Sequence, residues 1–222
     1  MYALFDLDDT VHNKPASLEA CAESMHLKFL NTSEVGELQF KDKFVKENCI
    51  IQPKVQVFEK LARNFTLDQN TQASMLKYFD ESFHYYSKRF SNVLESMEYL
   101  KSLGVKIACV TNGRDFFQRN KIKALGLDGF FEVIVTSGEL STKKPDPFIF
   151  ETALGKLGAT ADKAVFIGDN LKADVEPSKK LGMTTIWVNS SSETKPDFVD
   201  YQLKSFSEFP GIWQAITRRC SR

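Results

Sequence analysis

A short apolar run at the start of the chain ends in a burst of acidic residues. Residues 2–7 are predicted to form a buried strand, which delivers Asp6 and Asp8 and is followed by Thr10. Side chains two positions apart in a strand point to the same side, so the two carboxylates share one side. Ligands of open α/β sheets bind beyond the carboxyl ends of the strands. Taken alone the segment also fits a solvated turn, but its position favours a site of chemistry.

Polar residues also follow three later predicted strands, which cover residues 105–110, 133–135 and 164–167. They comprise a hydroxyl and an amide, then a lysine doublet, then two further acids, namely Thr111, Asn112, Lys143, Lys144, Asp169 and Asp174. Parallel strands present their carboxyl ends at one edge of a sheet. We therefore expect acids, a hydroxyl and an amine to converge in one crevice.

These residue types together indicate phosphoryl chemistry with a metal ion. Carboxylates about 4 Å apart repel each other by roughly 1–4 kcal/mol per pair, so they stay ionised together only around a cation. Oxygen ligands with few carboxylates suit Mg²⁺, which shares its shell with substrate phosphate. A hydroxyl, backbone amides and a lysine suit phosphate oxygens. An aspartate can then act as a covalent nucleophile.

The elements that must position these residues alternate along the chain. After residue 92 predicted helices and strands follow each other, with a fifth strand over 184–188. A closing amphipathic helix is marked by Phe209, Ile212, Trp213 and Ile216. Such alternation predicts an α/β fold with a doubly wound, Rossmann-like parallel sheet covered by helices on both faces.

One long segment interrupts this alternation. Residues 14–90 contain no convincing strand, and apolar residues such as Leu18, Cys21 and Met25 recur there at helical spacing. The segment is far longer than an ordinary crossover. We therefore predict a catalytic core of residues 1–13 and 91–222, with residues 14–90 inserted as an α-helical cap at the mouth of the sheet.

Composition narrows the function classes. The 222 residues are 42% hydrophobic and 26% charged, with a formal net charge of zero, which argues against a nucleic-acid or anionic-membrane surface built on bulk charge. No apolar run approaches the roughly 20 residues that span a bilayer, and no signal peptide is expected. The four cysteines and three histidines fit no ligand pattern, so packing or surface roles are expected. We expect a cytoplasmic monomer or homodimer.

The chain resembles the haloacid dehalogenase superfamily, in its phosphatase branch with a helical cap after the first motif. That family carries Asp-x-Asp-x-Thr, then a Thr or Ser after a strand, then a Lys commonly followed by Pro, then an acidic pair after a strand. All four motifs occur here in order, as Asp6 with Asp8 and Thr10, Thr111, Lys144, and Asp169 with Asp174. Lys143 is the alternative choice within the lysine doublet.

The resemblance implies a Mg²⁺-dependent phosphomonoester hydrolase that works through an aspartyl-phosphate. Asp6 would attack phosphorus, and Asp8 would protonate the leaving oxygen and then activate water. Thr111 and the amide of Asn112 would hold phosphoryl oxygens. Lys144 would offset the charge on the nucleophile and the phosphate.

The resemblance also implies a metal site. Mg²⁺ would be bound by the Asp6 side chain, the Asp8 backbone carbonyl and the Asp169 side chain, with Thr10 in support. Asp174 would act through water or by orienting the motif lysine. The alternative for Asp174 is a first-turn helix acid favoured by the helix dipole.

Other reactions on the same fold stay open. Haloacid dehalogenases proper lack the second acid of the first motif, so Asp8 argues against that reaction. Sugar phosphomutases share both acids, and a non-catalytic binding module would keep the fold alone. Phosphonate hydrolases of the family use a cap lysine, for which the candidates are Lys14, Lys41, Lys43, Lys46 and Lys54.

The cap is expected to choose the substrate, which we predict to be a small phosphorylated metabolite such as a nucleoside monophosphate or a sugar phosphate. A cluster near the end of the cap suggests an aromatic or anionic leaving group, or else a packed final helix. It consists of Tyr85, Tyr86, Lys88, Arg89 and Phe90.

Overall fold

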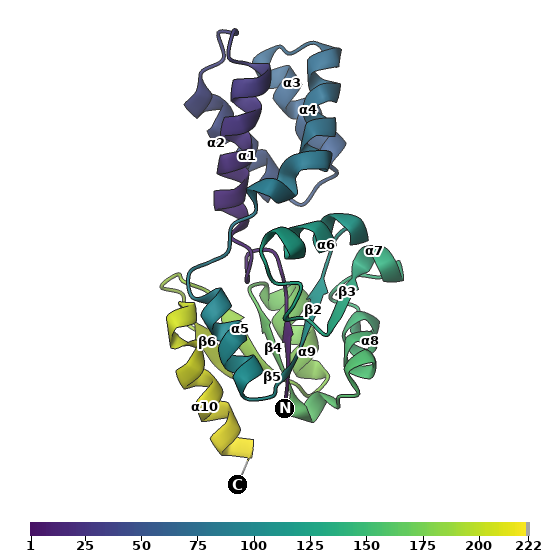
Figure 1. Ribbon diagram of the computed structural model, residues 1–222, viewed down its shortest axis with the longest axis vertical. Coiled ribbons are helices and arrows are strands. Elements are labelled where there is room, and N and C mark those ends of the chain that lie inside the picture. Colours follow the sequence, from purple (N-terminus) through teal and green to yellow (C-terminus); the bar gives the residue numbers. More distant parts are fainter. Residues whose placement is uncertain (221–222) are drawn as a thin grey trace. The chain divides into compact units, whose positions relative to one another are not determined.

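The computed structural model describes residues 1–220 and divides into two compact units (Figure 1). One unit holds residues 1–12 together with the chain from residue 89 onward, and the other holds residues 13–88. Within residues 1–220 no helix is both long enough and apolar enough to cross a membrane.

The first unit is built on a six-stranded parallel sheet with the strand order β3-β2-β1-β4-β5-β6. In chain order the strands are Tyr2–Phe5, Lys106–Thr111, Val133–Thr136, Ala164–Gly168, Thr184–Val188 and Tyr201–Leu203. Strand β1 pairs with β2 on one side and with β4 on the other, where the strand order reverses. The expected doubly wound α/β fold is confirmed, and the ends of β1, β2 and β4 meet at its switch point.

Helices cover both faces of this sheet (Figure 1). Ala3 and Phe5 of β1 pack in one buried cluster with α5 and α10, whereas Leu4 packs in another with α8. This alternation follows from the two-residue period of a strand. The helices are α5 (Val93–Ser102), α6 (Asp115–Ala124), α7 (Ser137–Leu140), α8 (Pro147–Leu157), α9 (Glu176–Lys180) and α10 (Phe209–Cys220).

Residues 13–88 form the helical unit. Its helices are α1 (Lys14–Phe29), α2 (Glu37–Cys49), α3 (Lys54–Phe65) and α4 (Gln69–Ser82), followed by the 3₁₀ turn η1 (Phe83–Tyr86). Phenylalanine rings fill its core, with centroids 6.0 Å apart for Phe44 and Phe79 and 5.8 Å for Phe58 and Phe79. The Asp68 carboxylate caps α4 by accepting from two backbone amides.

Three elements differ from the sequence-based expectation. Strand β1 ends at Phe5, although the Asp6 amide still donates to Ile167 of β4 at 2.9 Å. The helix expected directly after β4 begins as a π-helical turn, η3 (Leu171–Val175), before α9. The short strand β6 was not predicted, because three residues show no clear alternation.

Candidate active site

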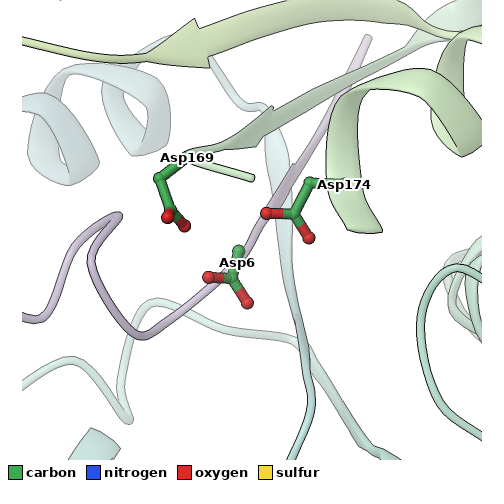
Figure 2. Close-up of side chains that lie close together, drawn as sticks. All are labelled: Asp6, Asp169 and Asp174. Carbon is green, nitrogen blue, oxygen red and sulfur yellow. The ribbon is translucent and has the colours of Figure 1, made fainter. Parts of the chain in front are cut away.

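The carboxyl ends of β1 and β4 bring three acids together. Asp6 directly follows β1, Asp169 directly follows β4, and Asp174 lies in the π-helical turn beyond it. One carboxylate oxygen from each lies within 4.8 Å of the others (Figure 2). This trio, Asp6, Asp169 and Asp174, is called the acid cluster below.

Lys144 is the cation of the acid cluster. Its Nζ lies 2.5 Å from Asp6 Oδ1 and 2.7 Å from Asp174 Oδ1, and the residue is 4% exposed. Burial opposes its charge, but the carboxylates of Asp174 and Asp6 raise the pKa of Lys144 above its usual value. Lys143 is exposed, so the structure selects Lys144 from the doublet.

The side chain of Asn112 fixes the segment that carries Lys144. Its Oδ1 accepts from the Lys144 amide at 2.9 Å, and its Nδ2 donates to the Lys144 carbonyl at 3.1 Å. The two bonds hold the backbone of Lys144 on both sides of its Cα, which places the lysine stem beside the end of β2. The role expected for the Asn112 backbone amide toward phosphate stays a prediction.

The acid cluster has more carboxylates than cationic side chains to balance them. Burial, together with the charges of Asp174 and Asp9, raises the pKa of Asp169 to about 7. Burial also raises the pKa of Asp6 well above its usual range, even though Lys144 opposes this. Three crowded carboxylates share one ammonium, and their all-oxygen donor set fits a hard divalent cation such as Mg²⁺.

Local backbone features allow this crowding. A Cβ on Gly168 would lie 2.7 Å from the Asp174 side chain, so only glycine permits that approach. The amide of Asn170 donates to Asp174 Oδ2 at 3.1 Å. Thr10 Oγ1 donates to Asp169 Oδ1 at 3.1 Å, which ties the first motif to the fourth. Single-turn π-helical segments occur frequently at functional sites.

Asp8 has a separate set of partners. Lys121 Nζ lies 2.5 Å and 2.7 Å from its two carboxylate oxygens, and His12 Nδ1 lies 2.6 Å from Oδ1. Burial alone would raise the pKa of Asp8, but Lys121 and His12 hold it well below its usual range. Asp8 is therefore ionised near neutral pH, which is the form that accepts a proton.

Three partners in the site were not predicted. His12 was expected to have a packing or surface role; it is buried, and in addition its ring nitrogen bonds to Asp8, which was not predicted. Gln118 and Lys121 of α6 were missed because a glutamine and a lysine on an amphipathic helix usually face solvent. The sequence feature that could have indicated them is their i, i+3 spacing, which puts both side chains on one face of the helix that follows Thr111.

The aromatic cluster expected at the end of the helical segment does not form one helix. The last helical turn of that unit ends at Tyr86, whose hydroxyl donates to Ser24 at 2.6 Å. Arg89 belongs to the other unit, where its side chain donates to the Leu125 carbonyl. Tyr86 and Arg89 therefore each bond within their own unit, and Tyr85 is exposed.

A cavity of about 660 Å³ opens beside the acid cluster within the first unit. Asp9 and Asp169 form its acidic side, and Trp187 and Phe206 supply apolar wall. Such a cavity has the size and mixed lining of a small-molecule site.

Comparison with known proteins shows which family the sequence matches. A family model described as haloacid dehalogenase-like hydrolase matches residues 3–188. Glyceraldehyde 3-phosphate phosphatase of Methanopyrus kandleri is 29% identical over 192 residues, covering 82% of this chain and 81% of that protein. The protein of the same name from Methanocaldococcus jannaschii is 25% identical over 223 residues, covering 94% of this chain and 95% of its own length.

Solved structures show the same fold. The HAD-hydrolase YfnB from Bacillus subtilis, crystallised bound to magnesium, superposes with a TM-score of 0.77 at 18% identity and covers 96% of this chain and 98% of its own. At this identity the likeness shows the fold alone.

Proposed function

Because the chain belongs to the family of haloacid dehalogenase-like hydrolases, we propose that it hydrolyses phosphate monoesters with Asp6 as the covalent nucleophile. The observation that carries this proposal is the buried Asp6 carboxylate, which lies beside Lys144 and within 4.8 Å of the two other acids. The glyceraldehyde 3-phosphate phosphatases among its relatives support a phosphomonoesterase.

In the first step an Asp6 oxygen attacks phosphorus, a bond to phosphorus forms, and the ester P–O bond breaks. The electron pair of that bond stays on the leaving oxygen, which takes a proton to become the free alcohol. Asp8 is the proposed donor, and since it rests as a carboxylate, the proton it gives comes from solvent in the first turnover and from the water of the second step in each later one. Thr111 and the Asn112 amide are proposed to hold the phosphoryl oxygens, and Lys144 to balance their charge.

In the second step water attacks the phosphorus of the acyl phosphate. The new P–O bond displaces the Asp6 carboxylate, so inorganic phosphate leaves and the free enzyme returns. Asp8 in its resting ionised form is suited to accept the proton of that water.

We propose that Mg²⁺ would be held by the carboxylates of Asp6 and Asp169 with the Asp8 backbone carbonyl. Thr10 and Asp174 would orient these groups. When bound, the ion supplies positive charge that lets the acids stay ionised beside a phosphate dianion.

The proposed substrate is a small phosphorylated metabolite, such as a triose phosphate, a sugar phosphate or a nucleoside monophosphate. The cavity beside Asp169 is large enough for such a molecule. The presence of Asp8, with two buried partners, favours ester hydrolysis over carbon–halogen cleavage. We also propose that the helical unit, residues 13–88, selects the substrate.

Release of inorganic phosphate from glyceraldehyde 3-phosphate, sugar phosphates and nucleoside monophosphates tests this function. We expect release that requires Mg²⁺, stops with chelator, and is lost in Asp6→Asn. Asp128→Asn, an exposed acid of the same unit, serves as the matched control and should keep parental rates. Parental rates in Asp6→Asn would contradict the proposal.

A further inference from the structure

Gln118, on the first turns of α6, contacts the two polar motifs that lie on either side of the proposed phosphate position. Its Nε2 lies 2.6 Å from Thr111 Oγ1 and 3.0 Å from the Asn112 carbonyl oxygen, with Asp8 Oδ2 more distant at 3.4 Å. The side chain is 1% exposed. A buried carboxamide with these neighbours has a fixed orientation, which can be worked out from their chemistry.

The orientation follows from what each neighbour can do. A backbone carbonyl oxygen only accepts hydrogen bonds, so the amide nitrogen of Gln118, and not its oxygen, must face Asn112. The carboxylate of Asp8 likewise accepts. The same nitrogen therefore donates to Thr111 Oγ1, and the Thr111 oxygen is the acceptor in that bond.

Donation by Gln118 has a consequence for the hydroxyl proton of Thr111. A threonine hydroxyl carries one proton, and a bond received from Gln118 leaves that proton to be donated elsewhere. Among the described residues the Thr111 hydroxyl, 1% exposed at the end of β2, donates to no protein group. A buried donor of this kind calls for an acceptor from outside the protein chain.

Gly113 makes room for this arrangement. Its φ is +148°, and a Cβ there would lie 2.9 Å from the Gln118 side-chain carbonyl carbon. Any larger residue at this position would displace the carboxamide from Thr111. The loop after β2 is thus shaped to receive the Gln118 side chain.

We propose that Gln118 is a positioning residue that turns the Thr111 hydroxyl proton toward a phosphoryl oxygen of the substrate. The inference rests on the proposed function, because it deepens the role given there to Thr111. Gln118 would act on the phosphate through Thr111, and its other bond in the site is the longer one, 3.4 Å, to Asp8 Oδ2.

The test is a double-mutant cycle of Gln118→Met and Thr111→Val, read as kcat/KM for a phosphomonoester with Mg²⁺. Gln118→Met keeps the length of the side chain and removes its donors. We expect it to lower kcat/KM roughly tenfold to a hundredfold, the value of one hydrogen bond to a charged group. In the Thr111→Val background the same change should have a much smaller effect, because the hydroxyl it orients is gone and only the longer bond to Asp8 Oδ2 is left to lose.

Lys123→Met, on the exposed side of the same helix, is the matched control and should match the parent. Equal losses from Gln118→Met in both backgrounds, or no loss in the parent background, would overturn the proposal. If Gln118→Met does not fold, Gln118→Glu keeps the shape but can only accept in its ionised form. Gln118→Glu should lower kcat/KM at least tenfold relative to the parent, and parental kcat/KM in this variant would also refute the inference.

Calorimetric binding of inorganic phosphate with Mg²⁺ separates this inference from the proposed function. Gln118→Met should weaken phosphate binding whether or not the parent turns over an ester, and parental affinity would refute the positioning role. A parent that binds phosphate but releases none from esters would contradict the proposed function alone.

Discussion

At the scale of single residues, the site is governed by a mismatch of charge. Asp6, Asp169 and Asp174 share one buried ammonium, and burial together with the charges of neighbouring acids raises the pKa of Asp6 and of Asp169. Placing three acids so close is unfavourable without a further cation. A bound cation would offset this repulsion, which accounts for the close placement of the three carboxylates.

This mismatch predicts how pH and Mg²⁺ act on stability. The pKa of Asp169 is raised from 3.8 to about 7, so between these values the folded protein binds more protons than the unfolded chain. Its contribution to the stability of the metal-free protein is therefore lost as pH rises through that window. Mg²⁺ should raise Tm more at about pH 8 than at about pH 5, where protons compete with it.

Thermal denaturation with and without Mg²⁺ measures this effect. Asp169→Asn, which removes a proposed ligand, should shrink the Mg²⁺ shift itself at both pH values, while Asp128→Asn should keep the parental shift and its pH dependence. An equal Mg²⁺ shift at both pH values in the parent would show that Asp169 does not titrate as described.

At the scale of elements, α6 belongs to the site as fully as the strand ends do. It carries Gln118 and, one turn later, Lys121, which is 2% exposed and bonded to both oxygens of Asp8. The helix follows directly on the loop after β2, so the same short segment delivers Thr111 and two partners of Asp8, Gln118 and Lys121.

Lys121→Met should destabilise the protein, because Asp8 loses two charge-assisted hydrogen bonds in a largely buried setting. We expect a loss of roughly 1–3 kcal/mol in the free energy of unfolding at neutral pH. Lys123→Met on the exposed side of α6 should stay within about 0.5 kcal/mol. Urea denaturation compares the two, and equal stability would show that the Asp8 contact contributes nothing.

The helical unit also contains a buried carboxylate that is paired with lysines, that of Glu47 in α2. Its side chain is 7% exposed and lies 2.9 Å from Lys43 and 3.3 Å from Lys60. The hydrogen bond from Lys43, with others from Gln52 and Lys60, lowers the pKa of Glu47 from 4.5 to about 2. A lowered pKa stabilises the fold above pH 4.5, and this contribution is lost as pH falls through about 2.

Glu47→Gln should therefore lower stability by roughly 1–3 kcal/mol at neutral pH. The difference from the parent should shrink as the pH falls below 4.5. Glu59→Gln, an exposed acid on α3, is the control. A destabilisation that stays constant across this pH range would indicate that the amide perturbs packing and that charge is not the cause.

At the scale of the whole molecule, the sheet creates the site. Asp6 and Lys144 are 138 positions apart in sequence, and they meet because β1 lies between β2 and β4. Residues 13–88 interrupt the chain between the first two strands, which nevertheless pair in register, with Phe5 opposite Cys109. The site therefore forms only when distant segments of the core have paired.

Much of this could be predicted because buried parallel strands are short apolar runs with polar ends. That pattern predicts the strands before Asp6, Thr111 and Asp169 and the edge at which they meet. It says nothing of which side chains pair across that edge. The contacts of Lys121 and His12 with Asp8 depend on how α6 packs, and a buried lysine has the same local pattern as a solvated one.

The central claim is that Asp6 becomes phosphorylated during turnover, and rapid quenching followed by mass spectrometry tests it most directly. Protein mixed with Mg²⁺ and a phosphomonoester, then quenched in acid, should carry one phosphoryl group on the peptide that contains Asp6. Asp6→Asn should carry none under the same conditions. Phosphate release from the parent with no phosphoryl group on Asp6, or with one on another residue, would contradict the account.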